Sequence, residues 1–145
     1  MKEYNLFISH SWSYNNDYLS LNNLLRQNGY FKFNNFSVPI DNPLTIYNKG
    51  YYYTELRNKI KSKMKYCNVV LVLAGVYSTY SESIKMEIDV AKELEKPIIA
   101  IEPYGSEKTS LIVKENANII VKWNSNSIIS AIKELSNEES VTNRN

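Results

Sequence analysis

Residues 69–74 read Val69-Val70-Leu71-Val72-Leu73-Ala74, the strongest strand signal in the chain. The run is rich in β-branched residues and has no polar position on either of its two faces. Such a strand is typical of the middle of a parallel sheet, where helices cover both faces. The run therefore predicts a central strand buried between two layers of helices.

Four weaker strand signals lie on either side of this run. They are expected at residues 6–8, 36–40, 97–101 and 119–121. Between the strands, apolar residues recur at intervals of three and four, which predicts helices that begin near residues 17, 53, 79, 110 and 125. The second strand contains Pro39, so we expect it at an edge of the sheet.

Strands that alternate with helices predict an α/β fold with a parallel sheet. Right-handed crossovers leave few arrangements, and five strands favour a flavodoxin-like three-layer sandwich with strand order 2-1-3-4-5 and helices on both faces. This order reverses between the first and third strands, and a ligand crevice opens beyond their carboxyl ends. We expect residues 1–136 to form a single domain and residues 137–145 to form a polar, disordered tail.

The composition argues against several classes of protein. A formal net charge of +2 gives no large electrostatic footprint for nucleic acid, and the basic residues between 57 and 65 fit a solvated helix face. Cys67 is the only cysteine, and we expect it to be a buried apolar residue; with one histidine, the chain offers little for a metal site. No apolar stretch approaches the roughly 18 residues of a membrane span. The N-terminus lacks a signal-peptide pattern, so we expect a cytoplasmic protein.

An acidic residue, Glu87, lies on the flank of the apolar stripe of the third predicted helix. It follows Ile84 by three positions and precedes Ala91 by four, so it is expected to be half-buried near the crevice. A carboxylate against apolar surface loses hydration at a cost of several kcal/mol unless it is paired. The pattern leaves two interpretations open: a function in the crevice, or an ion pair with a lysine of a neighbouring helix.

Other polar and aromatic residues are expected around the same crevice. The hydroxyls of Ser81 and Ser83 bind ribose or phosphate at the start of the helix, or they cap the helix. Ser9 and Ser11 lead from the first strand into the crevice with the histidine, which is a general base or a structural hydrogen-bonding group. The two aromatic rings stack on a flat ligand, or they pack in the protein. These candidate binding residues are Ser9, His10, Ser11, Trp12, Tyr80, Ser81 and Ser83.

Two classes of protein share this fold, and each needs particular residues at its active site. A phosphoacceptor receiver domain needs acidic residues after the first strand and an Asp after the third, where this chain has Ser9, His10 and Gly75. A flavodoxin needs a phosphate loop rich in hydroxyls and glycine, and residues 9–13 contain no glycine. The receiver interpretation is excluded, while a nucleotide- or flavin-binding protein stays as a weaker alternative.

Three segments resemble the Toll/interleukin-1-receptor-like (TIR-like) domains, in particular the small bacterial group of Thoeris anti-phage defence systems. Residues 7–10, Phe-Ile-Ser-His, resemble the first-strand box of the family. Residues 78–91 resemble its helix entry, with a serine followed by a glutamate, and residues 96–101 resemble its fourth strand. With the order of the elements, the resemblance covers about residues 4 to 135.

The resemblance implies an enzyme that cleaves the nicotinamide–ribose bond of NAD and makes a cyclic ADP-ribose isomer or a related signal. NAD is the substrate and no separate cofactor is implied; the partners implied are an effector protein reached by the diffusible product and further copies of the chain. The family glutamate corresponds to Glu87 and its serine to Ser81.

Two positions qualify this correspondence. Many family members have a Trp where this chain has Ser83, which leaves the shape of the nicotinamide pocket open. Asp41 is a further candidate site residue, because it begins the loop that occupies the place of the mobile loop of the family. The rival interpretation is a non-catalytic TIR-type module that signals by self-association.

Overall fold

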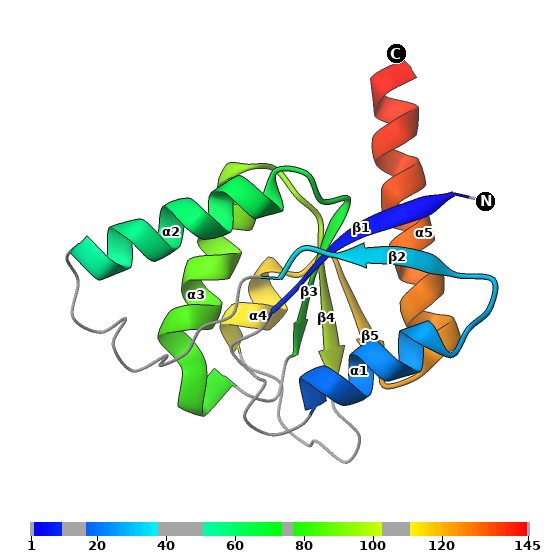
Figure 1. Cartoon of the computed structure of the whole chain (residues 1–145), viewed down its shortest axis with the longest axis horizontal. Coiled ribbons are helices and arrows are strands. Elements are labelled where there is room, and N and C mark those ends of the chain that lie inside the picture. Colours follow the sequence, from blue (N-terminus) through cyan, green and yellow to red (C-terminus); the bar gives the residue numbers. More distant parts are fainter. Residues whose placement is uncertain (1, 10–16, 38–50, 74–76, 103–110, 145) are drawn as a thin grey trace.

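A computed structural model describes residues 2–9, 17–37, 51–73, 77–102 and 111–144. Its five strands form one parallel sheet in the order β2-β1-β3-β4-β5 (Figure 1). The strands are β1 (Glu3–Ile8), β2 (Lys32–Asn35), β3 (Val69–Leu73), β4 (Ile98–Glu102) and β5 (Ile119–Lys122). The flavodoxin-like fold class and the predicted strand order are therefore confirmed.

Helices cover both faces of this sheet. They are α1 (Asp17–Arg26), α2 (Tyr51–Met64), α3 (Tyr77–Glu93), α4 (Leu111–Asn116) and α5 (Ser125–Arg144). Apolar residues of α1 and α5 form one hydrophobic cluster with the sheet, and those of α2, α3 and α4 form a second. Because the two clusters lie on opposite faces, the protein has the three layers that the sequence predicts (Figure 1).

The strand that decided the fold, β3, lies in the middle of the sheet and is buried at every position. Alternate residues serve alternate faces: Leu71 and Leu73 pack in the cluster with α1 and α5, whereas Val70 and Val72 pack in the cluster with α2 and α3. A strand with two buried faces needs apolar side chains in both directions. This requirement explains why its sequence shows no alternation.

The second strand is not where the sequence predicts it. The expected strand at residues 36–40 is wrong: β2 is Lys32–Asn35, Phe36 follows the strand, and residues 38–40 lie outside the described residues. The rings of Tyr4, Phe31 and Phe33 stack in series at centroid distances of 5.5 and 5.7 Å, in a register that places Tyr4 opposite Phe33. The predicted position at an edge of the sheet is confirmed.

The last helix is longer than expected. Residues 137–144, predicted as a polar tail, continue α5 as far as Arg144, and Figure 1 shows these turns projecting past the sheet. Of the helices in the described ranges, none combines the length and the apolar character needed to cross a membrane.

Candidate functional site

The carboxyl end of β1 brings Ser9 against Glu87 of α3. The Ser9 hydroxyl donates a hydrogen bond of 2.5 Å to Glu87 Oε1. Both residues are 0% exposed, and they are 78 positions apart in the sequence. Folding thus creates a buried hydroxyl–carboxylate pair at the point where the order of the strands reverses.

Backbone pairing determines the place of Ser9. Its N–H donates to the Leu71 carbonyl of β3 at 3.0 Å, which continues the register of β1 on β3. On the other side of β1, the Ser37 hydroxyl donates to the Ile8 carbonyl at 2.6 Å. The ends of β1, β2 and β3 are therefore joined, and Ser9 lies between the strands that the sequence places at the crevice.

The sequence analysis missed the hydrogen bonds made by Ser37. Besides the Ile8 carbonyl, its hydroxyl contacts Asn35 Oδ1, and its N–H donates to the same oxygen at 2.9 Å. A hydrogen bond from a backbone N–H to the side chain of an Asn two residues earlier is the pattern of an Asx turn. This spacing is the signal that could have identified the turn in the sequence.

The packing of α3 determines the place of Glu87. Its neighbours along the helix are buried on a broad face, and they are Ile84, Met86, Ile88, Val90 and Ala91. The sequence predicts a half-buried flank for Glu87, but the side chain is fully buried because the end of β1 covers that flank. The carboxyl group therefore does not point into bulk solvent.

Burial makes this pair electrostatically costly. Removing a carboxylate from water costs several kcal/mol, and a hydrogen bond to a charged group returns about 1.5–3 kcal/mol. A separation of 2.5 Å is typical of a hydroxyl that donates to an ionised oxygen. The arrangement suits a carboxylate that stabilises positive charge on a bound molecule.

Cations on α2 contact a different glutamate of α3. Arg57 and Lys61 both form ion pairs with Glu93, at 3.1 and 3.2 Å, near the end of the helix. These contacts confirm that the basic stretch of α2 is a solvated helix face, with Lys59, Lys63 and Lys65 exposed. Arg57 and Lys61 therefore form their ion pairs with Glu93.

The other predicted site residues fall into two groups. His10, Ser11, Trp12 and Asp41 lie outside the described residues. Residues Tyr80, Ser81 and Ser83 belong to the helical backbone of α3 before Glu87, but their side chains are not among those described. The structure therefore brings Ser9 and Glu87 together and leaves the roles of the others as predictions.

The cysteine has the environment predicted for it. Cys67 is buried between α2 and β3, and burial raises the pKa of its thiol to about 12, against a smaller opposite effect of Lys96. At neutral pH a thiol with so high a pKa stays protonated, and a protonated thiol is a poor nucleophile. Within the part of the chain that the structure describes, no cluster of three or more His, Cys, Asp or Glu could hold a metal ion.

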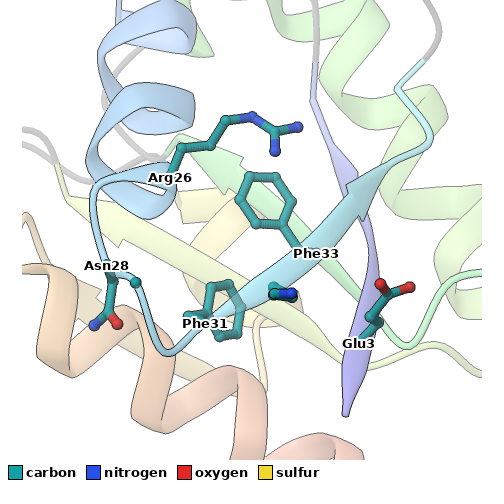
Figure 2. Close-up of a pocket in the computed structure, with 7 residues that line it drawn as sticks. Glu3, Arg26, Asn28, Phe31 and Phe33 are labelled. Atoms are coloured by element: carbon teal, nitrogen blue, oxygen red, sulfur yellow. The ribbon is translucent and has the colours of Figure 1, made fainter. Parts of the chain in front are cut away.

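A pocket of about 380 Å³ lies at the opposite, amino end of β1 and β2 (Figure 2). Two of its polar lining groups contact neighbouring residues: the Arg26 guanidinium lies 4.4 Å from the Phe33 ring centroid, and Asn28 Oδ1 accepts from the Tyr30 N–H at 2.9 Å. Ser9 and Glu87 remain the better candidate site, because they lie where the order of the strands reverses and ligands of such sheets bind.

Comparisons with solved structures show the fold alone. NtrX from Brucella abortus in complex with ADP has a TM-score of 0.56 and 8% identity, over 99% of this chain and 28% of that protein. The signal receiver domain of a putative Luxo repressor protein from Vibrio parahaemolyticus has a TM-score of 0.56 and 5% identity, over 98% and 96% of the two chains.

Comparisons of the sequence point to one family. No curated protein matches the chain. Residues 7–108 match the family described as Thoeris protein ThsB, TIR-like domain. The matched segment includes both Ser9 and Glu87.

Proposed function

The chain belongs to the family of TIR-like domains of the Thoeris protein ThsB, and from this membership we propose that it cleaves NAD in anti-phage defence. The bond broken is the one between nicotinamide and ribose. The product is a cyclic ADP-ribose isomer or a related ADP-ribose signal, which diffuses through the cytoplasm and activates an effector protein.

Glu87 is the proposed catalytic residue. When the glycosidic bond breaks, its electron pair leaves with nicotinamide, and the ribose develops oxocarbenium character. A carboxylate close to the ribose stabilises that positive charge and can hold the ribose hydroxyls. The single observation that carries this role is the fully buried Glu87 carboxyl at the β1/β3 reversal.

Exclusion of water would determine the product. A hydroxyl of the substrate attacks the ribose carbon and loses its proton, or a ring nitrogen attacks through its lone pair and the base then releases a proton from its amino group; either new bond closes the cyclic product. If water attacks instead, the product is linear ADP-ribose. His10, Ser11, Trp12, Asp41, Tyr80, Ser81 and Ser83 stay as proposed substrate-binding residues.

The proposal is tested by mixing the purified full chain with NAD and measuring nicotinamide release by chromatography. We expect Glu87→Gln to lower the rate by about 10²-fold or more, the effect of removing one stabilising group from a transition state. Glu93→Gln is the matched control, since this exposed glutamate lies on the same helix and pairs with α2.

Two results would count against the proposal. Equal activity of the wild type and Glu87→Gln would remove Glu87 from the mechanism. No nicotinamide release by the wild type, together with no loss of cellular NAD during phage infection, would favour the rival module that acts by self-association.

A further inference from the structure

Ser9 is a buried hydroxyl whose position is determined by the backbone. Its N–H is bonded to the Leu71 carbonyl of β3, so its Cα is held at the junction of two central strands. Its side chain is 0% exposed and donates to Glu87 Oε1. The hydroxyl is thus directed at the carboxylate, although the sequence predicts a contact with substrate.

The Glu87 carboxylate needs such a contact to have one orientation. Packing of α3 determines the position of the Glu87 backbone, but the last torsion of a glutamate side chain has broad preferences. The bond from Ser9 holds one carboxylate oxygen from a different element of the fold. Catalytic groups are effective only when supporting contacts lock their orientation before substrate binds.

We propose that Ser9 is a positioning residue for the reaction: its buried hydroxyl orients the Glu87 carboxylate toward the ribose and does not itself bind NAD. This inference rests on the proposed function, since it assigns a role relative to Glu87. The sequence places Ser9 and Glu87 in the same crevice, but under this proposal only Glu87 contacts the substrate.

Kinetics of Ser9→Ala in the full chain test the inference. We expect kcat for nicotinamide release to fall about 10–100-fold, since loss of orientation at a reacting group has effects of this size, while KM changes less than about 2-fold. Ser9→Thr keeps the hydroxyl and is expected to regain most of kcat. Ser9→Cys, which has a weaker donor, is expected to be intermediate.

Ser37→Ala is the matched control. It removes another hydroxyl bonded at the end of β1, to the Ile8 carbonyl, without touching Glu87. We expect it to keep kcat within about 3-fold of the wild type, so a general loosening of the strand ends cannot account for the effect of Ser9→Ala. If Ser9→Ala fails to fold, as judged by circular dichroism, the kcat of Ser9→Cys decides.

A second readout does not depend on activity. In protein with ¹³C-labelled glutamate carboxyl groups, the Glu87 signal is the one absent from Glu87→Gln, and Ser9→Ala should shift it. No shift would overturn the inference, as would an unchanged kcat or a raised KM at unchanged kcat in Ser9→Ala. If the wild type releases no nicotinamide and cellular NAD is not lost during phage infection, the proposed function fails, and the ¹³C signal still decides whether Ser9 holds Glu87.

Discussion

Replacing the buried pair by apolar side chains, in the double variant Ser9→Ala/Glu87→Met, is expected to stabilise the protein while it abolishes NAD cleavage. Both residues are 0% exposed, so the wild type bears the full desolvation of a carboxylate. Substitution of buried charged groups by apolar residues of similar volume is often stabilising, by about 1–4 kcal/mol. Methionine resembles glutamate in helix propensity, so the backbone of α3 should contribute little to the difference.

The magnitude follows from opposing contributions. The variant loses the charge-assisted hydrogen bond between Ser9 and Glu87, worth about 1.5–3 kcal/mol, and is relieved of a desolvation penalty of several kcal/mol. Burial of the new Met side chain contributes about 1.5–3 kcal/mol. We expect a net gain of about 2 kcal/mol, which raises the Tm of a domain near this size by about 4–8 °C.

Urea unfolding of four proteins measures this gain: the wild type, both single variants and the double variant. Ser9→Ala alone should destabilise the protein, since it leaves Glu87 buried without this donor. Glu87→Met alone should be less stable than the double variant, because the Ser9 hydroxyl loses the Glu87 acceptor. The cycle gives the coupling free energy of the two side chains.

A double variant less stable than the wild type would show that burial of the carboxylate does not destabilise the fold. The pair would then contribute to the stability of the fold, and stability would be sufficient to explain a buried glutamate at position 87. A stabilised double variant without activity has the opposite meaning: the carboxylate lowers stability, which is typical of functional sites.

Three further predictions concern the rest of the protein. Glu95 has a φ of 56° just after α3, where its N–H donates to the Lys92 carbonyl. Because glycine adopts this left-handed conformation without strain, Glu95→Gly should raise the free energy of unfolding, measured in thermal melts, by about 1 kcal/mol. Glu95→Ala keeps a Cβ and should give no such gain. Burial raises the pKa of Cys67 to about 12, so little of its thiol is ionised at pH 8. Iodoacetamide should therefore alkylate Cys67 about 10³-fold more slowly in the folded protein than in the guanidinium-unfolded chain. Equal alkylation rates in the two states would contradict the prediction. Hydrogen bonds from Lys61 and then Arg57 lower the pKa of Glu93, so this glutamate stabilises the fold above its unfolded pKa and the contribution is lost as the pH falls through its folded pKa. Glu93→Gln should therefore be less stable than the wild type in urea at pH 7, and a difference that does not shrink as the pH is lowered below the unfolded pKa would show another cause.

Local patterns predicted much of this fold, and their failure at β2 is instructive. Alternation between Phe36 and Ile40 has the period of a strand, yet the strand lies at Lys32–Asn35. The strand that forms places Phe33 opposite Tyr4 of β1, and Phe31, just before the strand, stacks on the same Tyr4 ring. A contact between residues so far apart in the sequence does not show in the local periodicity of either segment.

The three-layer α/β architecture could be predicted from the amino-acid sequence, because the apolar run of β3 and the helical spacing of α3 are local properties of the chain. The sequence also indicated Glu87, since an acidic residue on an apolar flank stands out in the pattern. The full burial of this carboxylate and its hydrogen bond from Ser9 become visible only in the folded protein. The physical reason is that burial and hydrogen bonding depend on which element covers a side chain, and the order of the strands places the end of β1 over α3.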